Sequence, residues 1–415
     1  RQKTTCGRNP PNPGPWPHIN KANPIHLSKL SLNGFRNHLD TNLELCPGLT
    51  LFQGQNGHGK SNLLEAAYMM AIAKSPRSVD ERELVNWSLA ETGGHMQVLG
   101  IGRDGDKTIQ AQIDVDIAPP AASSKGPGAF RKGLRVNGIK HSAIDFVGNL
   151  NIVFFEADDL EIVSGSPGRR RRYLDILISQ SNPSYLKSLQ RYGQVVRQRN
   201  QLLRRIRDGI AQEDELNFWD ERLAYEGSRI VRARQIAVNG LNDHATPAHE
   251  ELSVGDALEL GYVPRIYNST TGAGEDTTMS HELIETEIAE SLVQVRKREI
   301  SQGMTAVGPH RDDVEIAING KSAARFASRG QKRTIALSLK MAEVFFVRQS
   351  TGRTPVLALD DILSELDPDR RLLVLKVASE SEQVLLTATE PEIVPPEFIS
   401  RAKIFNIRDG RVSGS

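Results

Sequence analysis

GQNGHGKS, at Gly54–Ser61, lies between an apolar run that ends at Phe52 and the helix-like segment NLLEAAYMMAIA. It fits the pattern GxxxxGK[ST] in the setting that this pattern requires, a strand before it and a helix after it. Glycines let backbone N–H groups surround a phosphate, Lys60 adds a positive charge, and Ser61 can ligate Mg²⁺. The stretch predicts a nucleotide site with Mg²⁺ as its metal, formed by Gly54, Gln55, Asn56, Gly57, His58, Gly59, Lys60 and Ser61.

Length and composition indicate a globular protein of two or three domains, with 415 residues of which 38% are hydrophobic. The sequence contains no run of 18 uninterrupted apolar residues, and it begins without an apolar signal core. Two cysteines, Cys6 and Cys46, are too few for a disulfide framework or a zinc site. We therefore expect a cytoplasmic protein with no membrane association.

Charge is segregated along the chain, although the net charge is only +1. Residues 169–234 hold 15 basic and eight acidic side chains, whereas residues 243–290 hold eleven acids and one arginine. This asymmetry predicts a polyanion such as DNA on one face. The candidate DNA contacts are Arg169, Arg170, Arg171 and Arg172, and the alternative is a solvated helix surface.

The chain order predicts an α/β protein whose mixed sheet with flanking helices is interrupted by a mainly helical arm. Residues 1–24 are rich in Pro, Asn and Gly and are expected to be a disordered extension. Residues 25–182 form the N-terminal lobe, with an antiparallel meander over 95–139, and residues 301–415 form the C-terminal lobe. The arm, residues 183–300, begins with two antiparallel helices of about 40 Å each within 183–242.

A second chemical motif follows the apolar run Val356–Leu359, which is typical of a central parallel strand. The run ends in Asp360 and Asp361. In a P-loop ATPase the first carboxylate holds Mg²⁺ and the second orients or deprotonates the attacking water. We therefore assign Asp360, with Ser61, to the metal, and Asp361, with Lys60, to catalysis.

The third motif opens the helix that precedes this strand, at Ser328, Gly330 and Gln331. Alone, such a sequence is a helix cap, but a helix N-terminus is also an anion site. In a cassette-type ATPase this element meets the γ-phosphate that is bound to the other subunit. The residues that follow Asp361 occupy the place where such ATPases cross their dimer interface, namely Ser364, Glu365 and Asp367.

These motifs together resemble the ABC-type ATPases of the chromosome-maintenance and repair branch, which includes the SMC and Rad50 proteins, and most closely the RecF family. The matching pieces run from about residue 25 to the end of the chain. They are NGFRNH (Asn33–His38), GQNGHGKSNLLEA (Gly54–Ala66), SPRS (Ser75–Ser78), GSPGRRRRYLD (Gly165–Asp175), GPHRDD (Gly308–Asp313), SRGQKR (Ser328–Arg333) and LDDILSELD (Leu359–Asp367).

The resemblance implies an ATP-dependent DNA-binding homodimer with a weak ATPase activity and Mg²⁺ as cofactor. Its signature element, acting on the ATP of the other subunit, would be Ser328, Arg329, Gly330 and Gln331. Members of the family act in DNA repair, replication and recombination and in the SOS response. They work with RecO and RecR, and through them help to load the RecA recombinase at gapped DNA.

Two classes of function remain open at this point. In the first, the protein is a DNA clamp that ATP closes and hydrolysis reopens. In the second, the same head belongs to another SMC/Rad50-like processing ATPase, to a nuclease-coupled ATPase or to a transporter subunit. A nuclease would need a further cluster of metal-binding carboxylates or histidines, and none follows Asp367 in the sequence. A transporter subunit would separate Ser61 from Asp360 by far fewer residues.

Overall fold

The computed structural model describes residues 23–78, 80–90, 93–118, 129–253, 255–266, 280–379 and 381–414. The predicted N-terminal extension lies outside these residues, except that residues 23 and 24 begin the first strand. No helix in the described part of the chain has the length and apolarity that crossing a membrane requires.

A six-stranded, mainly parallel sheet carries the phosphate loop and the Asp360 strand. Its strand order is β16-β15-β3-β14-β13-β8, and only β16 runs antiparallel to its neighbour. Every residue of β8, β13 and β14 is buried, as expected for parallel strands that are covered on both faces. The strands are β3 (Gly48–Gln53), β8 (Ile152–Phe155), β13 (Val356–Asp360), β14 (Gln383–Ala388), β15 (Lys403–Arg408) and β16 (Arg411–Gly414).

The second sheet has seven strands in the order β12-β1-β4-β5-β6-β7, with β2 paired to β1, and only β12 runs parallel to its neighbour. Its part from β4 to β7 confirms the antiparallel meander predicted over 95–139. Helix α1 (Lys60–Ile72) packs between the two sheets, and its buried residues join a core with side chains from both of them. The strands are β1 (Asn23–Phe35), β2 (His38–Glu44), β4 (Gly94–Asp104), β5 (Lys107–Ile117), β6 (Phe130–Val136), β7 (Ile139–Lys140) and β12 (Arg353–Thr354).

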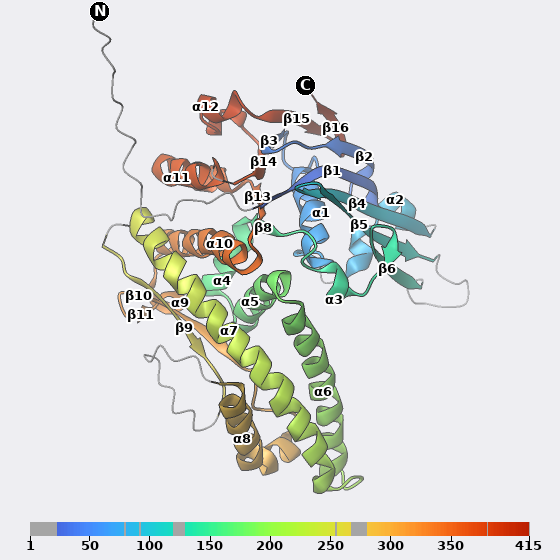
Figure 1. Ribbon diagram of the computed structural model, residues 1–415, viewed down its shortest axis with the longest axis vertical. Helices are drawn as coiled ribbons and strands as arrows, with labels where there is room; N and C mark the ends of the chain where they lie inside the picture. The colour runs from blue at the N-terminus through green and yellow to red at the C-terminus, as the bar shows by residue number, and fades with distance from the viewer. Residues whose placement is uncertain are drawn as a thin grey trace, which may run out of the picture.

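The arm is built from α6 (Pro183–Arg207), α7 (Leu216–Leu252) and α8 (His281–Gln302), which extend away from the sheets (Figure 1). The expected length of about 40 Å for the second arm helix is wrong, because the 37 residues of α7 span about 56 Å. Helix α7 continues through Pro247 and packs against α10 (Arg329–Thr351). Packing against α10 thus extends the helix beyond the point where the sequence suggested an end.

A small sheet ties the acidic part of the arm to the C-terminal lobe. Strand β9 (Leu258–Val263) pairs with β10 (Asp313–Ile318), which also pairs with β11 (Lys321–Ser322). One hydrophobic core continues from the parallel sheet through α10 into α6, α7 and α8. The domain boundaries at residues 182 and 300 stay predictions.

The remaining helices are short or lie between the lobe and the arm. They are α2 (Trp87–Ala90), α3 (Ala143–Phe146), α4 (Leu160–Ser164), α5 (Pro167–Ser181), α9 (Ala323–Phe326), α11 (Pro368–Ser379) and α12 (Pro396–Ile399).

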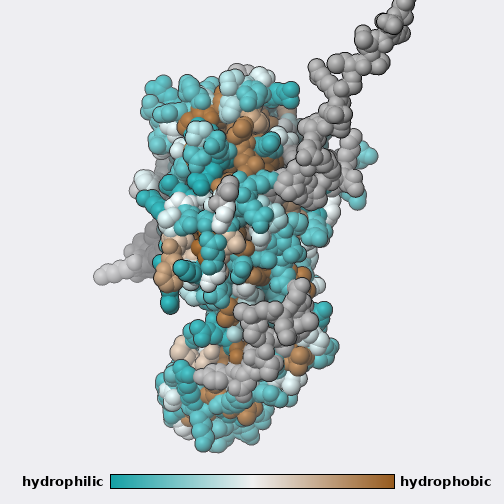
Figure 2. Space-filling view, turned by 90° about the vertical axis from the view of Figure 1, so that its left-hand side faces the viewer, coloured by the Kyte–Doolittle hydropathy of each residue, from teal (hydrophilic) through white to brown (hydrophobic). Residues whose placement is uncertain are grey.

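Figure 2 shows a mostly hydrophilic surface on the face it presents, with hydrophobic residues gathered in its upper part.

Candidate ATPase site

The phosphate loop connects β3 to α1, as the sequence predicted. Gly57 and Gly59 have φ angles of 83° and 106°, a region that other residues rarely adopt. The Lys60 Nζ donates to the carbonyl oxygens of Gly54 at 2.6 Å and Gln55 at 3.0 Å. The loop therefore folds around the lysine ammonium group, at the N-terminus of α1 where backbone N–H groups are free for an anion.

The structure brings Ser61 and Asp360 together across the sheet. The Ser61 hydroxyl donates to Asp360 Oδ1 at 2.9 Å, although β14 lies between β3 and β13. Thr387, near the end of β14, links this strand to the end of β13. Its hydroxyl donates to Asp360 Oδ1 at 2.8 Å and accepts from the Asp361 N–H at 2.8 Å. Thr387 was not among the site residues expected from the sequence.

A serine hydroxyl beside a carboxylate fits Mg²⁺, which prefers oxygen ligands and completes its shell with water and phosphate oxygens. Among the described residues, no group of three or more His, Cys, Asp or Glu side chains could hold a metal ion. Ser61 and Asp360 are the residues that would hold Mg²⁺.

Asp361 follows β13 in a left-handed conformation, with a φ of 51°. Burial raises the pKa of this carboxyl, while the Ser364 hydroxyl and Lys60 act in the opposite direction. A raised pKa suits a group that accepts a proton near neutral pH. The role of Asp361 as a base nevertheless stays a prediction.

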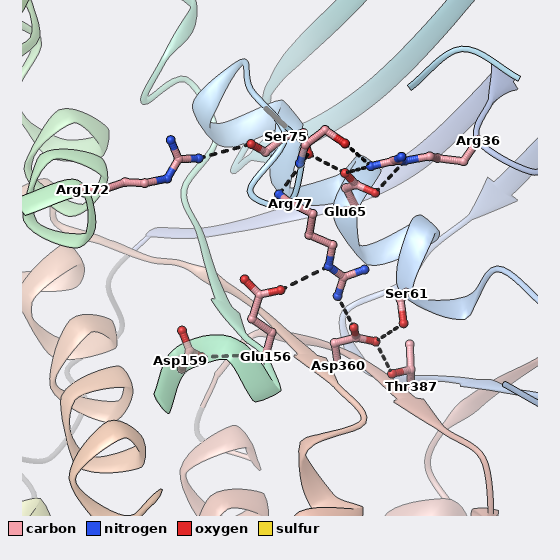
Figure 3. Close-up of polar contacts among 11 residues, drawn as sticks. Arg36, Ser61, Glu65, Ser75, Arg77, Glu156, Asp159, Arg172, Asp360 and Thr387 are labelled. Carbon is pink, nitrogen blue, oxygen red and sulfur yellow. Dashed lines mark hydrogen bonds and ion pairs between the residues drawn. The ribbon is translucent and has the colours of Figure 1, made fainter. Parts of the chain in front are cut away.

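Arg77, which the sequence indicated only as part of SPRS, reaches the Asp360 carboxylate. Its Nη2 pairs with Asp360 Oδ2, and its Nε donates to Glu156 Oε2 at 3.2 Å (Figure 3). Burial opposes the charge of Arg77, but these two carboxylates outweigh it and raise the pKa of the guanidinium. Arg77 thus connects Asp360, the expected metal ligand, to Glu156, which directly follows β8.

A partly buried ion pair between Arg36 and Glu65 supports the turn that carries Arg77. Arg36 donates to both carboxylate oxygens of Glu65, at 2.9 and 3.2 Å, and Ser75 donates to Glu65 Oε1 at 2.5 Å (Figure 3). The Ser75 hydroxyl also accepts the backbone N–H groups of Arg77 and Ser78. Residues from three separate motifs, Arg36, Glu65 and Ser75, therefore position Arg77.

The phosphate loop is supported from behind by Asn37, His38 and the turn between β15 and β16. The His58 carbonyl accepts from Asn37 Nδ2 and from the Gly410 N–H, both at 3.0 Å. The buried His38 ring lies between the carbonyls of Gly59 at 3.0 Å and Gly410 at 2.9 Å. Burial lowers the pKa of His38, and a neutral ring can donate to only one of these carbonyls.

Gly410→Ala is expected to weaken nucleotide binding through this support. A Cβ at Gly410 would lie 2.0 Å from the Asn37 carbonyl oxygen, and the residue has a φ of 72°. Asn37 must then move, and it holds the His58 carbonyl. Gly105→Ala is the matched control, because its φ is 57° and a Cβ there meets nothing within 4 Å. Each variant should lose about 1 kcal/mol of stability from backbone strain alone, whereas titration with a fluorescent ATP analogue should show weaker binding only for Gly410→Ala. Equal affinities for both variants would contradict the support role.

The predicted signature element forms the exposed N-terminus of α10. Ser328 and Gln331 form a reciprocal capping box, with hydrogen bonds of 3.2 and 2.9 Å, which confirms the serine-capped helix start. Gln331 also donates to Asp256 at 3.1 Å, while Arg329 and Gly330 are exposed. Among the described residues, the hydrogen bonds of this capping box do not reach the phosphate loop of the same chain.

The predicted dimer-interface loop lies next to the signature helix. Arg333 of α10 pairs with Glu365 at 2.9 Å, Ser364 donates to the Asp361 carbonyl at 2.6 Å, and Asp367 accepts from the first turn of α11. Glu365 and Ser364 therefore connect the start of α10 to the Asp361 end of β13. Their contact with a second subunit stays a prediction.

The arginine run is largely engaged within the chain. Arg170 is buried and makes a bidentate pair with Asp313, at 2.7 and 3.0 Å, which corrects its assignment as a DNA contact. Arg171 donates to the Asp312 carbonyl at 2.6 Å, and Arg172 to the Ser75 carbonyl at 3.4 Å. The motifs GSPGRRRR and GPHRDD are thus joined by hydrogen bonds and an ion pair. The assignment of Arg169, Arg171 and Arg172 as DNA contacts stays a prediction.

Arg170→Met should destabilise the protein by about 2 kcal/mol or more, because it leaves the Asp313 carboxylate without its partner. Arg169→Met removes the same charge from the exposed neighbouring position and should change stability by less than about 0.5 kcal/mol. Urea unfolding of both variants measures the difference. Similar unfolding midpoints would show that the Arg170–Asp313 pair has little structural weight.

The two sheets, the phosphate loop, the Asp360–Asp361 strand end and the capped α10 define the head of an ABC-type ATPase. A family model described as the RecF/RecN/SMC N terminal domain matches residues 26–405. The chain belongs to the RecF family.

Individual relatives agree with this assignment over nearly the whole chain. The DNA replication and repair protein RecF of Roseiflexus castenholzii is 37% identical over 400 residues, covering 94% of this chain and 99% of that protein. The protein of the same name from Listeria monocytogenes is 33% identical over 398 residues, covering 94% of this chain and all of that protein, 100%.

Solved structures show the same fold. A structure described as the recombination mediator protein RecF with ATP in the RecFOR pathway has a TM-score of 0.83 and 32% identity, covering 96% of this chain and 100% of that one. An Smc head domain from Pyrococcus furiosus has a TM-score of 0.50 and 16% identity, covering 94% of this chain and 96% of that one. The second likeness concerns the fold alone.

Proposed function

We propose that this protein is an ATP-gated, DNA-binding homodimer of recombinational repair and replication, with slow ATP hydrolysis that times its hold on DNA. The observation that carries the proposal is that two half-sites of one chain are each incomplete. The phosphate loop is joined to Ser61 and Asp360, whereas the capped N-terminus of α10 is exposed and, among the described residues, its capping hydrogen bonds do not reach that loop. ATP held between two copies would complete both halves.

The phosphate loop and Lys60 would bind the nucleotide phosphates, and Mg²⁺ held by Ser61 and Asp360 would offset their charge. Asp361 would orient and deprotonate the attacking water. Ser328 and its neighbours would offer the free N–H groups of a helix N-terminus to the γ-phosphate in the partner copy. Because each nucleotide would contact both copies, ATP would stabilise the dimer by mass action.

DNA contacts would be made mainly to phosphates and would therefore weaken with salt. The names of the relatives, which refer to DNA replication and repair and to the RecFOR pathway, support DNA, RecO and RecR as partners. The protein would act on RecA indirectly, by helping to load it at gaps in DNA, and would thereby be linked to the SOS response. The alternative is another SMC/Rad50-like DNA-processing ATPase.

The proposal is tested by measuring binding to gapped, single-stranded and duplex DNA with ATP, with ADP and without nucleotide. Affinity for at least one of these DNAs should rise with ATP and fall with ADP, and it should fall steeply with salt. DNA binding that is equal in all three nucleotide states would contradict the gating.

Ser328→Ala should impair ATP-dependent dimerisation while ATP binding to the monomer stays nearly intact. The change removes the N-cap oxygen of α10, which accepts the Gln331 N–H, and it costs about 1 kcal/mol of helix stability. Ser322→Ala is a control, because Ser322 precedes the short helix α9 and its side chain makes no cap hydrogen bond. Dimerisation is followed by light scattering and ATP binding by fluorescence. Normal dimerisation of Ser328→Ala would remove the signature role.

A further inference from the structure

The outer face of α7 carries a line of aromatic, arginine and aliphatic side chains. Phe218, Tyr225 and Ile236 are 55%, 38% and 49% exposed, which is unusual for the solvent face of a helix. Three arginines lie between them along the helix, one between Phe218 and Tyr225 and two between Tyr225 and Ile236. We call this line the arginine stripe, and it consists of Phe218, Arg222, Tyr225, Arg229, Arg232 and Ile236.

The stripe is straight because its residues are separated by four, three, four, three and four positions. At 100° per residue these positions stay within about 40° of one line on the helix surface. The buried residues Leu223, Gly227 and Ile230 lie on the opposite side, which packs on α6 and α8. From Phe218 to Ile236 the stripe is about 27 Å long.

The arginines of the stripe keep their charge available. In the described part of the chain, no carboxylate lies within ion-pair distance of Arg222, Arg229 or Arg232, although Glu282 at the start of α8 interacts with Arg232 at longer range. Arg222 lies over the Phe218 ring at 5.7 Å. Arg229 lies over the Tyr225 ring at 4.5 Å and donates to its hydroxyl at 2.7 Å. The rings therefore hold two guanidinium groups against the stripe without neutralising them.

The spacing and the charge of the stripe together indicate which kind of molecule binds to it. Alternating steps of three and four residues are the a and d positions of a coiled-coil seam, which packs against another helix. A second copy of this chain is disfavoured, because pairing two stripes would gather six arginines. DNA is disfavoured, because phosphates make no use of exposed Phe218 and Ile236 at the two ends. Carboxylates opposite the arginines would satisfy the stripe.

We propose that the arginine stripe docks an acidic amphipathic helix of another protein. Apolar residues of that helix would cover Phe218, Tyr225 and Ile236, and Asp or Glu side chains would pair with Arg222 and Arg229. Aromatic and arginine side chains are the residues that contribute most to protein interfaces. The site lies on the arm, away from the phosphate loop (Figure 1), so the proposal does not depend on the ATP mechanism.

The test places the photo-crosslinking residue benzoylphenylalanine at position 225 of the full chain, in its native host under DNA damage. We expect a crosslink to a peptide of another protein that is helical and carries acids three and four residues apart. Arg222→Glu with Arg229→Glu should lower the yield at least about ten-fold. Changing the facing acids of the partner to lysine should restore it. The double variant should keep its ATP-dependent dimerisation and its DNA affinity within about two-fold.

Position 283 on α8 is the control site for the crosslinker, because Leu283 is 50% exposed but lies outside the stripe. A crosslink from position 225 to DNA or to a second copy would overturn the proposal. So would the absence of any crosslink, a partner peptide without acids, or a yield that charge reversal leaves unchanged. A loss of DNA affinity in the double variant would assign the stripe to DNA instead.

Discussion

Lys60→Ala is expected to abolish ATP-dependent dimerisation and DNA binding, with ATP affinity lower by at least about ten-fold. The reason is the position of its ammonium group inside the phosphate loop, within 3.0 Å of the Gly54 and Gln55 carbonyls. Without this charge, the loop loses the only side-chain cation that its motif supplies to the phosphates. Calorimetric titration with ATP, followed by DNA binding at saturating ATP, measures both effects.

Lys74→Ala is the matched control, because it removes the same charge just beyond α1 from an exposed position. It should leave ATP affinity unchanged. If Lys60→Ala still bound DNA with an ATP response of normal size, the nucleotide that controls DNA binding would have to occupy another site.

Asp361→Asn is expected to slow hydrolysis by about 100-fold or more while ATP binding is kept. The substitution preserves the size of the side chain and the hydrogen bond from the Asp361 N–H to Thr387, but removes the proton acceptor. The dimer should then remain closed on DNA in the presence of ATP. Steady-state ATPase assays and the dissociation rate from DNA measure the two consequences.

The pH dependence provides a second readout of the same residue. Burial raises the pKa of Asp361, so this carboxylate takes up a proton at a higher pH than an ordinary aspartate does. Acidification should therefore stop hydrolysis at a higher pH than it would if the base were an ordinary aspartate. The exposed Asp106→Asn should change neither the rate nor this profile. An Asp361→Asn variant that hydrolyses ATP at the normal rate would contradict the assignment of the base.

The phosphate loop, the buried β13 and the capped α10 could be predicted from the sequence because each depends on local rules. Glycines at fixed spacing, a continuous apolar run and a serine three residues before a glutamine are visible without tertiary contacts. These are also the places where prediction and structure agree.

The supporting residues could not be predicted because they act through contacts between distant segments. Thr387 joins Asp360 only because β14 lies between β3 and β13, and Gly410 reaches the phosphate loop from near the other end of the chain. Arg170 shows the opposite error. In the sequence it is one of four equivalent arginines, but burial against Asp313 makes it structural.

The central claim is that the ATP site is complete only between two copies, and the molecular mass in solution tests it most directly. Light scattering of the Asp361→Asn variant should show a monomer of 45.8 kDa without nucleotide and a dimer with ATP and Mg²⁺. Adding Ser328→Ala to this variant should return it to a monomer at saturating ATP. A dimer that forms equally well without nucleotide, or a monomer that remains when ATP is bound, would contradict the account.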